Sequence, residues 1–175
     1  MNSSFETQLN EHLQRHRKDG ILLDTNVLLL LLIAQFQPTL IGGKRLEKYT
    51  KDDAELLCRF VGRFSRILTT THILAETSNL AAQALSGRLK ADFFKQLFPL
   101  FCKDTREAFH KCPVDGSGIE EAIFVRLGLT DASLVATVNS GRLLLTDDLD
   151  LHCAVTAQES PSINFTHMRE AAGLL

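Results

Sequence analysis

Two short apolar runs that each end at an aspartate constrain the fold of this chain more than any other feature. Residues 21–23 (ILL) lead directly into Asp24, and residues 142–146 (RLLLT) lead into Asp147 and Asp148. Runs without alternating polar positions are typical of central strands in a parallel sheet, because such strands are buried on both faces. The sequence therefore favours a parallel sheet with helices on both of its faces.

Helical patterns and short strand-like runs alternate along the rest of the chain. We expect helices over residues 4–17, 26–36, 52–63, 72–85, 88–101, 119–127, 131–140 and 149–157. We expect strands over residues 21–23, 66–71, 112–115, 142–146 and 162–165. Residues 37–51, with a proline, two adjacent glycines and several basic residues, are expected to form an irregular insertion. This alternation predicts an α/β fold of three layers, α/β/α, with a central parallel sheet of about four or five strands.

Length and composition set broad limits on the kind of protein. The 175 residues fit one domain, which we place at residues 21–170 after an N-terminal helical extension over residues 1–20. A formal net charge of −2 argues against a protein that coats nucleic acid non-specifically. The four cysteines show no CxxC spacing, which argues against a zinc ribbon and favours reduced thiols in the cytoplasm. The longest apolar run has eight residues and a membrane-spanning helix needs about 20, so we expect no membrane partner.

Four acidic residues fall where the expected elements bring side chains to one edge of the sheet. Asp24 and Asp148 follow expected strands, and Asp131 begins a helix just after Gly128. Glu76 lies one turn into the helix that follows the second strand. Because ligands of such sheets bind beyond the carboxyl ends of the strands, we expect these carboxylates to lie close together.

Glu76 indicates what such a cluster needs. Its helix (HILAETSNLAAQAL) is apolar nearly all round, so we expect it to be largely buried. An unpaired buried carboxylate costs several kcal/mol or shifts its pKa, and no lysine or arginine lies within one turn of Glu76 in this helix. A divalent cation would relieve the repulsion between the acids, and ligands that are all oxygen favour Mg²⁺ or Mn²⁺ over Zn²⁺. A metal site of this kind suits the hydrolysis of phosphodiesters.

Each acid also has a simpler structural interpretation. Asp24, Asp131 and Asp148 each precede or begin a helix, where an aspartate serves as N-cap. Glu76 has the alternative of pairing with an arginine that is distant in the sequence. These alternatives are largely independent of one another, so a purely structural role for all four acids is the less favoured interpretation.

Four segments resemble the four motifs of the PIN-domain family, which includes the VapC-like ribonucleases. They are LLDTNVLL (residues 22–29), ILAETSNL (73–80), GLTDASLVATVNSG (128–141) and LLLTDDLDL (143–151), in the family's order. The resemblance implies a PIN-like fold and an endoribonuclease that depends on Mg²⁺ or Mn²⁺. It also implies a possible toxin role in which an antitoxin protein holds the enzyme inactive.

The resemblance assigns roles to individual residues. The acids that match the family's catalytic and metal-binding quartet are Asp24, Glu76, Asp131 and Asp148. Asp150 matches a further acid that binds metal through water, and Asp147 competes with Asp148 for its place in the motif. The polar residues that match those orienting the acids by hydrogen bonds are Thr25, Asn26 and Thr146.

Two departures from compact toxin members weaken the toxin assignment: the 23 residues before Asp24 and the basic insertion. In the insertion, Lys44, Arg45 and Lys48 are candidates for binding substrate phosphates, against the alternative of a solvated loop. The aromatic-rich helix over residues 88–101 is a candidate interface for a homodimer or an antitoxin.

Two other functions compete with the nuclease. One is a catalytically inactive PIN-like module that binds RNA or protein. The other is a phosphatase of the haloacid-dehalogenase type, which needs a second aspartate where this chain has Asn26.

Overall fold

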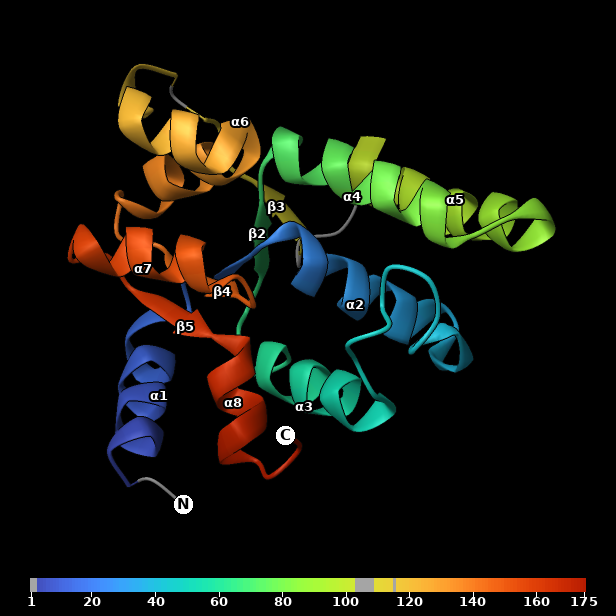
Figure 1. Ribbon diagram of the computed structural model, residues 1–175, viewed down its shortest axis with the longest axis horizontal. Coiled ribbons are helices and arrows are strands. Elements are labelled where there is room, and N and C mark those ends of the chain that lie inside the picture. The colour runs from blue at the N-terminus through green and yellow to red at the C-terminus, as the bar shows by residue number, and fades with distance from the viewer. Residues whose placement is uncertain (1–2, 103–108, 115) are drawn as a thin grey trace.

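The chain folds into three layers, α/β/α, around a parallel sheet (Figure 1). The computed structural model describes residues 3–102, 109–114 and 116–175. Within these residues the strands are β1 (Ile21–Leu23), β2 (Ile67–Thr69), β3 (Phe109–Lys111), β4 (Leu143–Thr146) and β5 (Ser162–Asn164). All neighbouring strands run parallel, in the order β3-β2-β1-β4-β5. The expected fold class is therefore confirmed.

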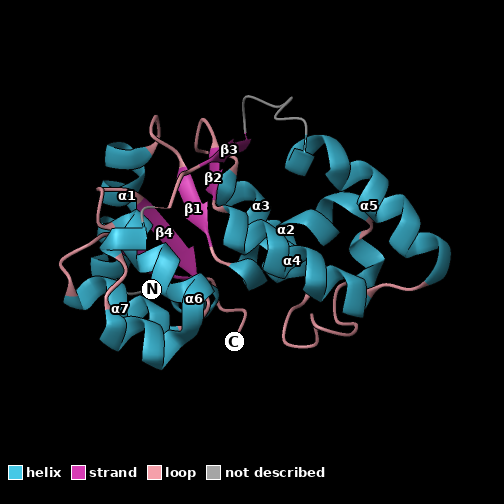
Figure 2. Cartoon of the chain, turned by 90° about the horizontal axis from the view of Figure 1, so that it is seen from above, coloured by secondary structure: helices cyan, strands magenta, loops and turns pink. Residues whose placement is uncertain are grey.

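Helices cover both faces of the sheet. They are α1 (Ser3–His16), α2 (Thr25–Phe36), α3 (Lys51–Val61), α4 (Thr71–Ala84), α5 (Gly87–Cys102), α6 (Glu121–Val138), α7 (Leu149–Ala157) and α8 (Phe165–Ala171), with short 3-10 helices η1 (Pro38–Leu40) and η2 (Gly116–Gly118). Figure 2 shows α2 to α5 on one side of the sheet and α1, α6 and α7 on the other. No helix in the described residues has the combination of length and apolarity that crossing a bilayer requires.

The strand order reverses between β1 and β4. From β1 the chain moves outward through β2 to β3, and it then returns to the other side of β1 to form β4 and β5. Strands β1 and β4 are paired in register, with Leu23 beside Leu145. In open α/β sheets such a reversal leaves a crevice beyond the carboxyl ends of the two strands. Here Asp24 follows β1, and Asp147 and Asp148 follow β4, so these acids border that crevice.

Helix α2 forms the centre of the core. Every residue from Val27 to Ile33 is buried, because α2 packs against the sheet as well as α3 and α4. Burying one leucine side chain contributes about 1.5–3 kcal/mol, so this leucine-rich helix holds the first layer firmly on the sheet. Asp24, at the helix N-cap, is thereby attached to one of the best-packed elements of the fold.

Helix α6 contains a break that the sequence indicated. Gly128 has φ +83° and ψ 176°, a conformation that an L side chain rarely adopts, so the helix divides into two parts there. This agrees with the two helices expected over residues 119–127 and 131–140. The break places Asp131 in the first turn of the second part.

Most elements begin and end within two residues of the expected bounds, and the differences at β3 and between α4 and α5 have a clear local cause. Strand β3 lies at residues 109–111 instead of 112–115; residue 115 lies outside the described part of the chain. The ladder ends after Cys112, whose N–H still donates to the Thr69 carbonyl at 2.7 Å, because Pro113 has no N–H to continue it. Helix α4 ends at Ala84 with Leu85 as C-cap, and Gly87, expected near that cap, instead begins α5.

Helix α8 was not predicted. Its seven residues are too few for a clear helical period, and it begins directly after β5. Its N-cap is Asn164, whose side-chain oxygen accepts hydrogen bonds from the N–H groups of Thr166 and His167 at 2.8 and 3.3 Å. The helix carries Arg169, whose guanidinium contacts Asp53 of α3 and the Lys48 carbonyl of the insertion.

Helix α1 packs on the same core as the rest of the chain. Leu13 is buried in that core, and the segment after α1 is joined to the segment after α3. Ser65 donates its N–H to the Arg17 carbonyl at 2.9 Å and its hydroxyl to the Lys18 carbonyl at 2.7 Å. The described part of the expected N-terminal extension, residues 3–20, is thus integrated into the fold. All four cysteines are free thiols, as expected.

Candidate active site

Asp24 is the buried centre of the acidic region. Its side-chain Oδ1 accepts the Val27 N–H at 2.7 Å, which caps α2. Its Oδ2 accepts the Thr146 hydroxyl and the Asp147 N–H, the latter at 3.0 Å. The residue is only 4% exposed. The N-cap role considered for Asp24 is therefore real, and it coexists with a position in the crevice between β1 and β4.

The environment of Asp24 disfavours its charge. Burial raises the pKa of this carboxyl, the neighbouring carboxylate of Asp147 raises it further, and hydrogen bonds from Thr146, Val27 and Asp147 oppose the change only in part. A buried carboxylate beside a second one is stabilised by a cation. A cation bound beside Asp24 would therefore stabilise the charged form of its carboxyl.

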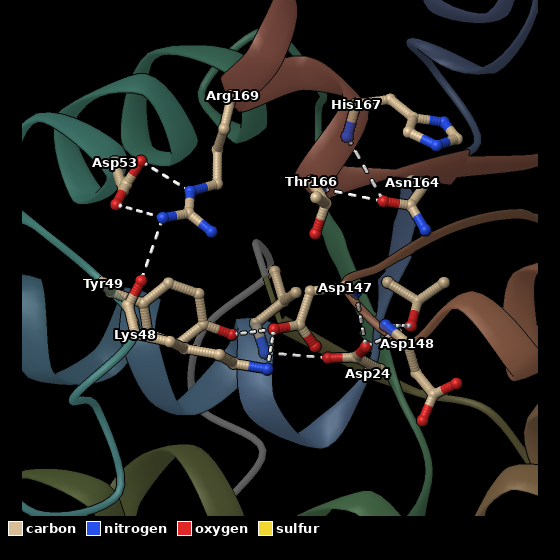
Figure 3. A network of polar contacts seen from close by, with 12 residues as sticks. Asp24, Lys48, Tyr49, Asp53, Asp147, Asp148, Asn164, Thr166, His167 and Arg169 are labelled. Atoms are coloured by element: carbon tan, nitrogen blue, oxygen red, sulfur yellow. Dashed lines mark hydrogen bonds and ion pairs between the residues drawn. The ribbon is translucent and has the colours of Figure 1, made fainter. Parts of the chain in front are cut away.

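Asp147 is held from the insertion, a contact that the sequence did not reveal. Its Oδ2 accepts the Tyr49 hydroxyl and forms an ion pair with Lys48 (Figure 3). Its side chain is 3% exposed, and its Oδ1 is buried with no hydrogen-bond partner among the described residues. The sequence offered Asp147 only as a competitor of Asp148, and nothing in it pointed to Tyr49.

Asp131 lies close to two other acids, Asp148 and Glu76. Burial raises the pKa of its carboxyl to about 6, with further contributions from the carboxylates of Asp148 and Glu76. These three residues come from α6, from the N-cap of α7 and from α4. Among the described residues, nothing donates a hydrogen bond or forms an ion pair with the Asp131 side chain. Its carboxylate thus lies near two like charges, with no compensating partner among the residues that the structure describes.

The prediction that the Glu76 helix is largely buried is wrong. Along α4, Ala75 and Asn79 are exposed and Glu76 is half-buried, because this face of the helix borders an open cleft instead of another layer. Glu76 is held on that side by the Thr25 hydroxyl, which donates to its Oε2 at 3.4 Å. The burial argument for a metal ion thus fails at Glu76 and applies at Asp24.

The cleft lies between α4 and the break in α6. It has a volume of about 530 Å³, and Glu76 and Asp131 both line it. The Gly128 break opens its α6 side, since residues 127–131 form that wall. Two carboxylates facing solvent in one cleft leave room for the waters and phosphate oxygens that complete the coordination of a Mg²⁺ ion.

Asp148 is exposed and caps α7. Its Oδ1 accepts the Leu151 N–H at 3.0 Å, and its own N–H donates to Thr146 Oγ1 at 3.0 Å. Thr146, which is fully buried, therefore joins Asp24 to the backbone of Asp148, in agreement with the orienting role expected for it. The capping contact leaves the second Asp148 oxygen available.

The other residues that the sequence predicted for the site differ in whether they contact the acids. The side chains of Asn26 and Asp150 make no hydrogen bond or ion pair within the described part of the chain, and Asp150 is exposed on the first turn of α7. In the insertion, the Arg45 guanidinium is hydrogen-bonded to Gln83 of α4. Of the basic residues predicted to bind substrate, only Lys48 pairs with an acid at this edge within the described chain.

The acids form two neighbouring groups. The side chains of Asp24 and Asp147 are buried, whereas Glu76 and Asp131 line the cleft and the exposed Asp148 lies close to Asp131. In the described residues no three acidic, histidine or cysteine side chains already stand in the arrangement of a metal site. Mg²⁺ typically uses one or two protein carboxylates and fills its other positions with water, so the donor set at Asp131 fits such an ion. The unpartnered oxygen of Asp147 is a second indication that this region lacks a polar partner.

Comparisons of the chain with protein-family models, with curated proteins and with solved structures find no match. A functional assignment therefore depends on the motifs and on the geometry of these acids. Both concern the same edge of the sheet, because each of the four motifs contributes at least one of the acids there.

Proposed function

We propose that this chain is a divalent-metal-dependent endoribonuclease of the PIN type, which hydrolyses RNA phosphodiester bonds with Mg²⁺ or Mn²⁺. The observation that carries the proposal is the position of Asp131 next to Glu76 and Asp148, with a raised pKa and no compensating partner in the described chain. Like charges brought together from three elements are costly, and a bound cation removes that cost.

The chain's own residues supply the coordination and the substrate path. Asp131, Glu76 and Asp148 would hold the ion from the cleft side, and Asp24 would do so from the buried side, with Asp150 acting through water. Thr25 and Thr146 keep Glu76 and Asp24 oriented by hydrogen bonds. When bound, the cation lowers the pKa of a water molecule and offsets charge on the phosphate. In this proposal the RNA strand reaches the acids through the cleft between α4 and α6, which Glu76 and Asp131 line.

The biological setting belongs to the same proposal. The motif resemblance supports a cytoplasmic nuclease. The family that the motifs resemble includes toxins that are paired with an antitoxin protein. On α5, Leu89 and Phe98 are large exposed apolar residues, and such surface suits an antitoxin or a second copy of the chain. Size-exclusion chromatography with light scattering tests the homodimer directly.

Substitution of the acids tests the nuclease activity. We expect Asp24→Ala and Asp131→Ala each to reduce Mn²⁺-dependent cleavage of a labelled single-stranded RNA by about 100-fold or more, because even residues behind metal ligands contribute 10- to 100-fold. Glu55→Ala is the matched control, since this exposed acid of α3 lies outside the site. Circular dichroism verifies that each variant is folded. Cleavage by the wild-type protein that persists in EDTA would contradict the proposal.

A binding module without catalysis is the second candidate. It is favoured by one observation: the acids in the described chain are not already arranged as a metal site. Fluorescence anisotropy with labelled RNA separates the two functions. Saturable binding without product in Mg²⁺, Mn²⁺ or Co²⁺ would support the module, and anomalous density between the acids in a Mn²⁺-soaked crystal would support the nuclease.

A further inference from the structure

Lys48 lies at the border between the buried acids and solvent. Its ammonium pairs with Asp147, whose backbone N–H in turn donates to Asp24 (Figure 3). The Lys48 side chain is 54% exposed, whereas that of Asp147 is 3% exposed. A lysine ammonium has three N–H donors, so one side of this group serves Asp147 while the other side faces solvent.

The backbone of Lys48 is held by a buried ion pair. The guanidinium of Arg169, on α8, donates to Asp53 of α3 at 2.7 and 3.0 Å and to the Lys48 carbonyl at 2.9 Å. Arg169 is 6% exposed and Asp53 is fully buried. A segment of the insertion is thereby attached to two helices at the residue that reaches the acids.

Tyr49 fixes the same segment from its other side. It is 2% exposed, its ring lies 6.4 Å from that of Phe165 and 5.6 Å from the Arg169 guanidinium, and its hydroxyl donates to Asp147. Lys48 therefore has a backbone that these contacts hold in place and a cationic side chain whose end is exposed. A solvated basic loop would need none of these contacts.

We propose that Lys48 binds a backbone phosphate of the RNA substrate beside the acids, with Arg169 as a positioning residue that acts through the Lys48 backbone. The inference rests on the proposed function. Phosphate is the matching chemistry because the exposed end of Lys48 is a positively charged hydrogen-bond donor beside Asp147, whereas the neighbouring Arg169 is buried and paired with Asp53. Asp147 keeps the ammonium in place, and Lys48 uses its remaining donors on the RNA.

The salt dependence of RNA binding tests this assignment. Binding of a labelled single-stranded RNA is measured by fluorescence anisotropy in Ca²⁺, with intact RNA verified on a gel. For Lys48→Gln we expect an affinity about 5- to 10-fold lower than wild type, and a slope of log K against log salt that is smaller by about 0.7, the value for one lost phosphate contact on a single strand. Lys48→Arg should retain the wild-type slope. Lys51→Gln, which removes an equal charge from the exposed end of the same insertion, is the matched control and should retain the wild-type slope.

The role of Arg169 is tested in the Lys48→Gln background. Arg169→Gln should reduce the salt slope of the wild-type protein but leave that of Lys48→Gln unchanged, which a purely structural role would not produce.

A Lys48→Gln slope equal to that of wild type, or a wild-type protein that does not bind RNA, overturns the inference. RNA binding with the expected slopes but without cleavage in Mn²⁺ would reject the nuclease and leave the phosphate contact standing.

Discussion

Individual carboxylates give the strongest indication of function in this chain, because their charged forms destabilise the folded protein. Folding places Asp131 where its charged form is disfavoured, so its pKa rises from 3.8 to about 6. The folded state then binds a proton more readily than the unfolded state between these two pH values. Stability therefore falls as pH rises through that window, is lowest above pH 6 and is unaffected below the unfolded pKa.

Asp131→Asn should consequently stabilise the metal-free protein while it abolishes cleavage. The full change in pKa corresponds to about 3 kcal/mol, and solvent screening of this partly exposed group reduces it to about 1 kcal/mol. Urea unfolding in EDTA at pH 7.5 should show the gain, and the same experiment near pH 4 should show little difference. Asp150→Asn is the control, because Asp150 is an exposed acid on the first turn of α7. A less stable Asp131→Asn protein at pH 7.5 would contradict the argument.

Sequence patterns located the residues that follow strands and missed their partners. Asp24 and Asp148 were predictable because an apolar run that ends at an aspartate indicates both a buried strand and its carboxyl end. The contacts of Asp147 with Lys48 and Tyr49 span about a hundred positions, and local periodicity holds no information on such pairs. Glu76 was correctly expected to lie among the acids, but for the wrong reason, since its side of α4, with Ala75 and Asn79, lines an open cleft.

Among the secondary-structure elements, α8 has the largest effect for its length. Its Arg169 neutralises Asp53, which is fully buried. Burial alone would raise the Asp53 pKa, but hydrogen bonds from Arg169 and Thr50 outweigh it and the net pKa is lowered. This contribution to stability is present above the unfolded pKa and is lost as pH falls through the folded pKa. Seven residues therefore join α3, the insertion and the end of the sheet.

Arg169→Met should destabilise the protein by about 3–5 kcal/mol, because it leaves a buried carboxylate without its counter-charge. Adding Asp53→Asn should restore part of that loss. Arg59→Met is the matched control: it breaks the Arg59–Glu55 pair on the same helix, where both side chains are about two-thirds exposed, and should cost about 1 kcal/mol or less. Equal losses of unfolding free energy in urea for Arg169→Met and Arg59→Met would show that the buried pair is unimportant.

At the scale of the whole molecule, ligand binding and folding are coupled. A cation that binds only the folded state at 100 times its Kd adds about 2.7 kcal/mol of stability, which for a domain of this size raises the melting temperature by about 5–10 °C. Mn²⁺ should therefore raise the melting temperature of the wild-type protein, and EDTA should reverse the change. Asp131→Ala should respond much less. A Mn²⁺ response in Asp131→Ala equal to that of wild type would place the ion elsewhere.

The pairing of β1 with β4 also has a consequence for biosynthesis. Thr146, which completes the hydrogen bonding of Asp24, is 122 positions further along the polypeptide. While the ribosome is still translating the intervening codons, one edge of β1 has no neighbour and the leucine-rich α2 has only part of its packing. Parallel sheets whose paired strands lie far apart in the sequence fold slowly, so the nascent chain exposes apolar surface during much of its elongation. The cluster of acids must likewise await the synthesis of Asp148, because this residue follows β4 and is the last of the four to leave the ribosome.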